Sequence, residues 1–81
     1  MNKLNPMAMG LAFGILWAAG VLIIALLAMS NGYGSEMIEA LGTVYLGLEA
    51  TLTGALIGAV WGFVDAFIGG YLLAWLYNKF L

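Results

Sequence analysis

Two long apolar runs dominate the chain, and a shorter segment of mixed polarity separates them. The first run covers residues 7–30 and contains no charged residue. The second covers about residues 51–77 and contains one acid, Asp65, near its centre. A helix rises about 1.5 Å per residue, so each run is long enough to cross about 30 Å of hydrocarbon. The pattern therefore predicts two membrane-spanning helices.

The segment between the runs changes in both period and polarity. Residues 31–35 combine Asn, Gly and Ser, which is typical of a turn, and Ser35 is expected to cap a new helix. In residues 36–48, apolar side chains then recur at helical spacing: Met37, Ile38, Leu41, Val44, Tyr45 and Leu48. This pattern favours a short amphipathic helix that lies at the membrane interface.

An alternative is that the amphipathic segment continues directly into the second run. One helix over residues 36–78 would be about 65 Å long, roughly twice the thickness of the hydrocarbon. A break near residues 48–53 is favoured, and Gly47 permits it. The predicted fold class is an all-α membrane protein. Its single domain, residues 1–81, is a two-transmembrane hairpin with an interfacial helix and a short tail at residues 78–81.

The residues that flank the two runs support this interpretation. Asn5 is a candidate N-cap, and Pro6 fits the first turn of a helix, where its missing N–H is not needed. The first run also exceeds the roughly 7–15 apolar residues of a signal-peptide core, so we expect a span. Trp75 and Tyr77 are placed as an aromatic belt would be at the end of the second run.

The few charged residues predict an orientation. Lys3 and Lys79 lie near the two ends, whereas the connection contains only acids, Glu36, Glu39 and Glu49. The positive-inside rule then places both termini in the cytoplasm and the connection outside. Tyr33 and Tyr45 are expected in the aromatic belt of that outer side.

Composition excludes several classes of protein. The chain is 65% hydrophobic and 7% charged, with a mean hydropathy of +1.10, which leaves too little polar surface for a soluble domain of 81 residues. It has no Cys and no His, which removes the usual zinc and haem ligands. There is no basic patch for nucleic acid, no phosphate-binding loop and no catalytic triad. We expect no enzyme activity, cofactor or metal, and membrane lipid as a partner.

Small residues recur every four positions in the second run: Gly54, Gly58, Gly62, Ala66, Gly70 and Ala74. The first run has a shorter series, Gly10, Gly14 and Ala18. Such stripes let membrane helices approach closely. Each four-residue step turns about 40°, so the longer ladder turns about 200° in total and one straight neighbour cannot use all of it. The two series predict packing within the hairpin, with the rest of the ladder available to another subunit.

Asp65 is the main candidate for a functional residue. An Asp at the centre of a span costs about 2.5–3.5 kcal/mol on insertion scales and marks a functional site by default. Neither span contains Lys or Arg to pair with it, so the carboxyl is protonated, hydrogen-bonded or in contact with water. In an antiparallel hairpin Trp17 lies at the same depth, and its indole N–H is a candidate donor. Trp61, one turn before Asp65, is a second candidate.

A second pattern in the same run has a spacing of seven residues: Thr51, Gly58, Asp65, Leu72 and Lys79. Each step drifts only about 20°, so these residues share one face of a helix. Around a symmetry axis this face would line a narrow pore with a ring of Asp65 side chains and a constriction at Leu72. The alternative is that Asp65 only fixes the helix register through hydrogen bonds.

Trp17, the small-residue ladder from Gly54 to Gly62, and the strings "WGFVDAFIGG" and "AWLYN" together carry a resemblance over nearly the whole chain. The sequence resembles small prokaryotic membrane proteins known as bacteriophage holins or holin-like proteins. The resemblance implies a two-span protein of the cytoplasmic (inner) membrane that forms oligomers. It implies no catalytic motif.

Three functions are consistent with these patterns. The first is a homo-oligomeric, holin-like or channel-like assembly with Asp65 inside. The second is a structural accessory subunit of a larger membrane complex. The third is a subunit that binds protons or cations at Asp65.

Overall fold

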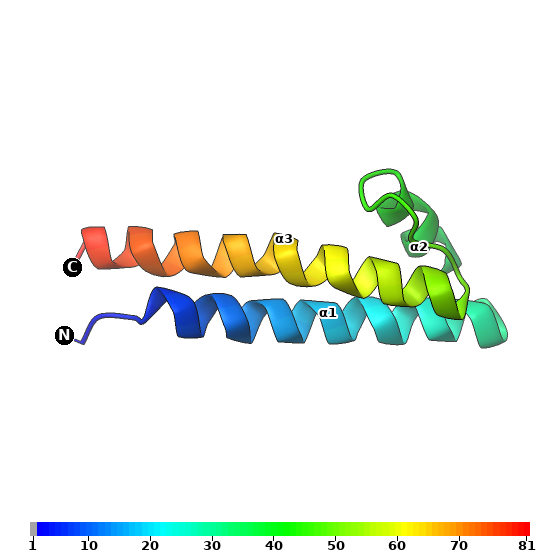
Figure 1. The fold of residues 1–81 in the computed structure, drawn as a ribbon, viewed down its shortest axis with the longest axis horizontal. Helices are drawn as coiled ribbons and strands as arrows, with labels where there is room; N and C mark the ends of the chain where they lie inside the picture. The colour runs from blue at the N-terminus through cyan, green and yellow to red at the C-terminus, as the bar shows by residue number, and fades with distance from the viewer. Residues whose placement is uncertain (1) are drawn as a thin grey trace.

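The computed structural model describes residues 2–81, and over this range the secondary structure is all helical. Helix α1 (Pro6–Asn31) and helix α3 (Leu52–Lys79) form an antiparallel hairpin, with a short helix α2 (Ser35–Gly42) at its closed end. The molecule measures 46 × 19 × 18 Å, and both termini lie at the same end (Figure 1). Both long helices are long and apolar enough to cross a membrane. The prediction of two long apolar helices joined as a hairpin is confirmed.

The capping residues fix where α1 begins and ends. The Asn5 side chain accepts a hydrogen bond from the Ala8 N–H at 3.1 Å, and Pro6 is the first helical residue, as the sequence predicts. The helix ends at Gly32, whose φ of +79° is a left-handed conformation that glycine adopts without a steric penalty. The Gly32 N–H donates to the carbonyl of Ala28 at 3.0 Å.

The segment after α1 differs from its prediction in two ways. Helix α2 ends at Gly42, so the helix expected over residues 36–48 stops early and is followed by a loop at residues 43–51. Ser35 is not the cap: the N-cap is Gly34, and the Ser35 hydroxyl donates to the carbonyl of Gly32 at 2.7 Å.

Local hydrogen bonds explain why α2 stops. The Thr43 hydroxyl donates to the carbonyl of Ala40 at 2.7 Å, and the Tyr45 N–H donates to the carbonyl of Leu41 at 2.7 Å, which closes a turn. The chain then folds back so closely that a Cβ on Gly42 would lie 3.1 Å from the carbonyl oxygen of Leu48. Gly47, with φ of +95°, completes the reversal. The alternative of one continuous helix over residues 36–78 is therefore wrong.

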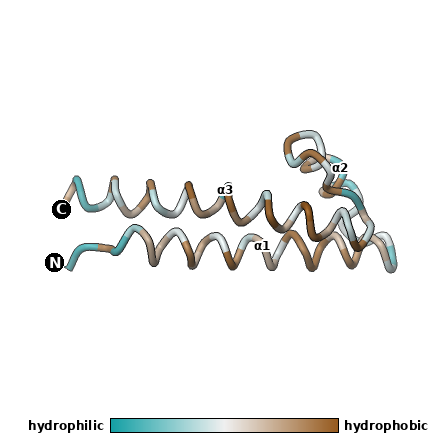
Figure 2. Tube along the Cα trace, viewed as in Figure 1, coloured by the Kyte–Doolittle hydropathy of each residue, from teal (hydrophilic) through white to brown (hydrophobic). Residues whose placement is uncertain are grey.

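Helix α3 starts with a side-chain cap at the predicted break. Thr51 is the N-cap, and its hydroxyl accepts a hydrogen bond from the Gly54 N–H at 2.9 Å. Hydrophobic residues follow along most of the helix, and polar residues concentrate toward the chain ends and around α2 (Figure 2).

The small-residue ladder is buried inside the chain rather than left for a partner. Gly54, Gly58, Gly62, Gly70 and Ala74 are all buried, and Ala66 is half-buried. Gly54 faces the backbone of Glu49, Gly58 faces Leu48 and Val21, and Gly62 faces Trp17 and Val21. Gly70 faces the backbone of Met9. The ladder does need two neighbours, as its drift predicts, but both belong to this chain: α1 and the loop. The expected free half is not present.

The shorter ladder on α1 receives aromatic side chains from α3. A Cβ at Gly14 would lie 2.9 Å from the Phe63 ring, and one at Gly10 would lie 3.0 Å from the Phe67 ring and its carbonyl oxygen. The two rings stack at a centroid separation of 5.9 Å. Ala18, the third residue of this ladder, is half-buried. The two helices thus pack by fitting large rings against glycines.

The open end of the hairpin is joined by a reciprocal pair of hydrogen bonds. The Leu4 N–H donates to the Asn78 side-chain oxygen at 2.9 Å, and the Asn78 amide nitrogen donates to the carbonyl of Leu4 at 2.7 Å. Beside it, the Lys79 ammonium lies 5.1 Å from the centroid of the Trp75 ring, which is a cation–π distance. These contacts place both chain ends together on one side of the hairpin.

Candidate functional site around Asp65

Asp65 takes part in a hydrogen-bonded chain built from three separate segments. The Tyr45 hydroxyl, from the loop, donates to Oδ2 of Asp65 at 2.5 Å. The Trp17 indole N–H, from α1, donates to the same tyrosine oxygen at 3.1 Å. Among residues 2–81, Tyr45 is the only side chain that donates a hydrogen bond to this carboxylate. The order is therefore Trp17 to Tyr45 to Asp65.

This arrangement corrects the expected partners of Asp65. Trp17 packs against Gly62, about one turn before Asp65, but Tyr45 takes its indole bond and stands between Trp17 and the acid. The second candidate, Trp61, donates to the backbone carbonyl of Leu46 at 2.9 Å. An indole has a single N–H, so neither tryptophan has a donor left for the carboxylate. Direct donation from an indole to Asp65 is therefore wrong.

Tyr45 is the residue of the candidate site that the sequence did not single out. The sequence predicts it in the aromatic belt of the outer side, whereas in the structure only 4% of its surface is accessible. The signal was present in the spacing: Ile38, Tyr45 and Leu48 are all buried, and they lie seven and three residues apart. They form one apolar face, although the helix that should carry this face ends at Gly42.

The loop that carries Tyr45 is held in place by packing on α3. Leu48 occupies the notch at Gly58, where a Cβ would lie within contact distance of its Cδ1 and Cγ atoms. The Tyr45 ring stacks on Trp61 with centroids 6.2 Å apart and planes 3° apart. The bond from Trp61 to Leu46 fixes the loop on the same side. The loop thus lies along the first part of α3, and the Tyr45 hydroxyl points to Asp65.

The environment of Tyr45 keeps its hydroxyl protonated. Burial raises the pKa of the Tyr45 phenol above its ordinary value of 10.0, and the hydrogen bond to Asp65 and the charge of that carboxylate act in the same direction. The bond received from Trp17 opposes them but does not reverse the shift. The phenol therefore remains a donor to Asp65 at neutral pH.

The seven-residue stripe does not form one open face in a single chain. Asp65, Leu72 and Lys79 are exposed. Gly58 is buried under Leu48, and the Thr51 hydroxyl caps α3. Of the five stripe residues only Gly58 is covered by the loop, whereas Thr51, like Asp65, Leu72 and Lys79, is exposed, so the open face is interrupted at Gly58.

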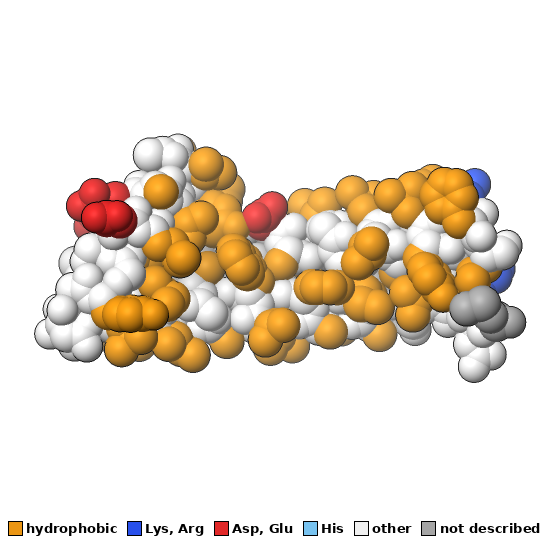
Figure 3. Space-filling view, turned by 180° about the vertical axis from the view of Figure 1, so that it is seen from behind, with side chains coloured by type: hydrophobic (Ala, Val, Ile, Leu, Met, Phe, Trp, Pro, Cys, Tyr) orange, Lys and Arg blue, Asp and Glu red, His pale blue; other side chains and the backbone are white. Residues whose placement is uncertain are grey.

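Asp65 lies within an otherwise apolar surface. Its side chain is exposed, as are those of its neighbours Val64 and Ile68. Figure 3 shows acidic side chains gathered near one end of the molecule and, apart from them, an acidic side chain within the hydrophobic surface. An apolar groove of about 390 Å³ lies on α3 and is lined by Ile57, Val60, Trp61 and Val64. Asp65 is not among the lining residues, but it lies about one helical turn after Trp61.

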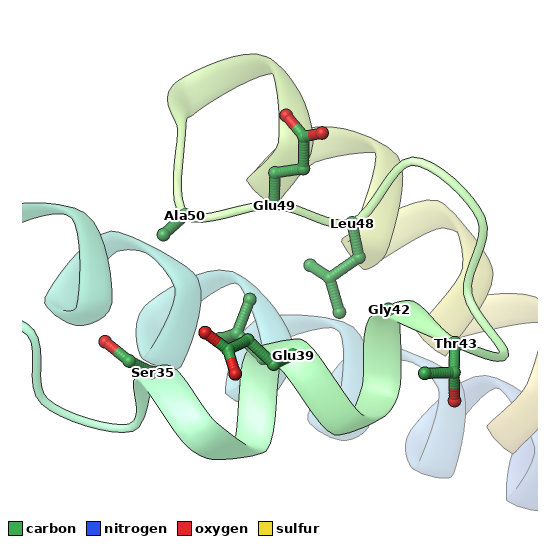
Figure 4. A pocket seen from close by; sticks show the side chains of 8 residues that line it. Ser35, Glu39, Gly42, Thr43, Leu48, Glu49 and Ala50 are labelled. Atoms are coloured by element: carbon green, nitrogen blue, oxygen red, sulfur yellow. The ribbon is translucent and has the colours of Figure 1, made fainter.

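A second hollow lies between α2 and the loop (Figure 4). Its volume is about 490 Å³, and its lining residues include two acids, Glu39 and Glu49. Within residues 2–81, no group of three or more acidic side chains is arranged to hold a metal ion. The hollow therefore has carboxylates at its edge but no metal-binding geometry.

Comparison with known proteins adds no assignment. No protein-family model, curated protein or solved structure matches this chain.

Proposed function

We propose that the chain is a small integral protein of a prokaryotic cytoplasmic membrane that assembles with copies of itself. The assembly is holin-like or channel-like, and Asp65 faces its interior. The observation that supports this proposal is the exposure of Asp65 at the middle of α3, a helix long and apolar enough to span a membrane. Placing a charged side chain in lipid at that depth costs about 2.5–3.5 kcal/mol. An assembly with a polar interior around Asp65 would avoid this cost.

The interface of this assembly differs from the one that the glycine ladder suggested. Because the ladder packs within the chain, contacts between copies must use the larger side chains around Asp65. Val64, Ile68 and Leu72 are each about half exposed on α3, at 48%, 53% and 51%. A copy packed on these side chains would bring the carboxyl groups toward a common centre. This is the geometry of an acidic ring in a cation pathway.

Crosslinking between copies tests the interface directly, because the chain has no cysteine of its own. Ile68→Cys is expected to form disulfide-linked dimers in lipid bilayers under mild oxidation, since Ile68 lies one turn from Asp65. Ile15→Cys is the matched control. Ile15 is 62% exposed and lies about 200° around α1 from Trp17, on the side away from the site. Native mass spectrometry from nanodiscs gives the number of copies.

The outcomes separate the candidate functions. A defined multiple of the chain mass with crosslinking at residue 68 alone supports the assembly. A monomer without crosslinks contradicts it, and a stoichiometric larger partner in place of copies indicates an accessory subunit. Conductance in liposomes that is lost or altered in Asp65→Asn supports the channel-like form. Unchanged conductance in that variant rules out an acidic ring.

A subunit that binds protons or cations is the second candidate function. The hydrogen bond from Tyr45 favours it, because a carboxylate with a fixed donor on one oxygen is oriented and leaves the other oxygen for a proton or cation. A binding subunit needs no continuous pore. This function is favoured over the channel-like assembly if liposomes show no conductance while Asp65→Asn changes proton uptake.

The orientation has its own test. We propose that both termini are cytoplasmic and that the connection with α2 is external, with α2 at the interface. Single cysteines at Asn2 and Tyr33 are expected to react differently with a membrane-impermeant maleimide added to intact cells: residue 33 labels and residue 2 does not. Tyr33 is 65% exposed, so access is not limited by packing. Labelling of residue 2 alone would show the opposite orientation, with the termini outside the cell.

A further inference from the structure

We propose that Asp65 and the groove beside it form a binding site for an amphiphilic cation. Such a molecule carries a positive charge, as in a quaternary ammonium or phosphonium group, next to apolar substituents. The groove is lined by Ile57, Val60, Trp61 and Val64. The carboxylate follows directly after Val64 on the same helix. All residues of the site belong to one chain, so binding does not require the proposed assembly, but Val64 and Asp65 are shared with its proposed interface.

The groove and the acid lie on one face of α3. Trp61 precedes Asp65 by four residues, and Ile57 precedes Trp61 by four, so the three side chains follow one another along the helix. All three are exposed, Ile57 by 38% and Trp61 by 41%. The volume of about 390 Å³ falls in the range of small-molecule sites. An apolar body in this groove would have its charged end beside the carboxylate.

The electrostatics favour a cation over a neutral or anionic molecule. Neither membrane helix offers an internal positive charge: their one basic residue, Lys79, lies at the end of α3 over Trp75. Trp61 adds an aromatic face, and Tyr45 stacks behind it with parallel planes. The face of an aromatic ring attracts cations, and more strongly where water is excluded. A carboxylate beside an exposed indole therefore selects positive charge by two independent effects.

The ligand must also be apolar around its charge. A small metal ion prefers several oxygen ligands, whereas Asp65 is the only carboxylate on α3. Among residues 2–81, no acidic cluster completes a metal site. The groove beside the acid supplies four hydrophobic side chains and no further acceptor. A ligand that fits this site needs one positive charge for the carboxylate and one apolar surface for the groove. An amphiphilic cation has both.

The experiment uses tetraphenylphosphonium and its anionic isostere, tetraphenylborate, as probes. Equilibrium dialysis of the full chain in neutral detergent is expected to show saturable binding of the cation and not of the anion. Asp65→Asn is expected to weaken cation binding by at least about tenfold, because it removes the charge but keeps the side-chain shape. Asp65→Glu keeps the charge and retains binding. Glu49→Gln, which removes an acid outside the groove, leaves binding unchanged.

A second pair of variants tests the groove without touching the acid. Val60→Trp places a large side chain in the groove and is expected to abolish saturable binding. Val44→Trp is the matched control, because Val44 and Val60 are equally exposed, at 67% and 66%, and Val44 does not line the groove. Circular dichroism confirms that each variant stays helical. The proposal is overturned if both probes bind alike, if Asp65→Asn binds the cation as the parent does, or if Val60→Trp has no effect.

Discussion

Gly70→Val is expected to lower the free energy of unfolding of the hairpin by about 1–3 kcal/mol, the usual cost of overpacking a close contact. A Cβ at position 70 would lie 2.7 Å from the carbonyl oxygen of Met9 and 2.8 Å from the ring of Phe13. The ring can turn, but the carbonyl belongs to the backbone of α1. The two helices must therefore separate, and neighbouring contacts between them weaken as well.

The adjacent glycine provides a matched control. A Cβ at Gly69 would meet nothing within 4 Å, so Gly69→Val adds the same side chain to open space. Both changes replace glycine by valine in the interior of α3, so their effects on helix propensity largely cancel. Unfolding by sodium dodecyl sulfate in mixed micelles, followed by tryptophan fluorescence, measures the difference. Equal stability of the two variants would mean that α1 and α3 do not approach as closely at this point as the structure shows.

Substitutions of the ladder glycines test packing within the hairpin and not packing between copies. Gly58 and Gly62 face Leu48, Val21 and Trp17 of their own chain. Bulky residues there would disturb the fold first and any assembly only as a consequence. A loss of oligomers in such variants is therefore no measure of the interface between copies, which is why crosslinking at residue 68 is the more direct experiment.

The two long apolar helices could be predicted because their signal is local. Residues 7–30 and 51–77 differ from α1 and α3 by only one or two residues at each end. In a membrane the backbone must satisfy its own hydrogen bonds, so a long apolar run has few alternatives to a helix. Asn5 and Pro6 marked the start of α1 for an equally local reason, since both act within the first turn.

The connection could not be predicted in the same way, because its conformation depends on contacts with α3. The apolar face of residues 36–48 was identified, and Ile38, Tyr45 and Leu48 are indeed buried. Its period alone favoured a longer helix. The chain instead reverses at Gly42 and Gly47, so that Leu48 packs at Gly58. That pairing joins two segments through tertiary packing, which overrides local propensity.

The candidate site was half predictable. Asp65 stands out because it is the only acid within either apolar run, and the hairpin brings Trp17 against Gly62, about one turn before it. Tyr45 did not stand out, because a tyrosine between two spans is ordinary at a membrane interface. Its role depends on the loop folding back along α3. The drift of the glycine ladder predicts more than one neighbour, which the structure shows, but the spacing does not reveal that the second neighbour is the loop that covers Gly54 and Gly58.

Removing one hydroxyl group tests the link between the loop and the hairpin. Tyr45→Phe is expected to lower the free energy of unfolding by about 1.5–3 kcal/mol, the usual range for a hydrogen bond to a charged group. The change takes the donor from Asp65 and the acceptor from Trp17 in one step. The emission of Trp17 should shift, because its indole N–H loses a fixed partner. Thermal unfolding in nonionic detergent with tryptophan emission gives both readouts.

Tyr33→Phe is the control for this change. Tyr33 is 65% exposed, and among residues 2–81 its hydroxyl makes no hydrogen bond, so the same substitution should alter neither stability nor emission. A double-mutant cycle with Asp65→Ala then isolates the bond itself. If Tyr45 holds the loop on α3 through Asp65, the two substitutions together cost less than their sum, by at least about 1 kcal/mol. Additive effects would show that stacking on Trp61 and packing of Leu48, rather than the acid, keep the loop in place.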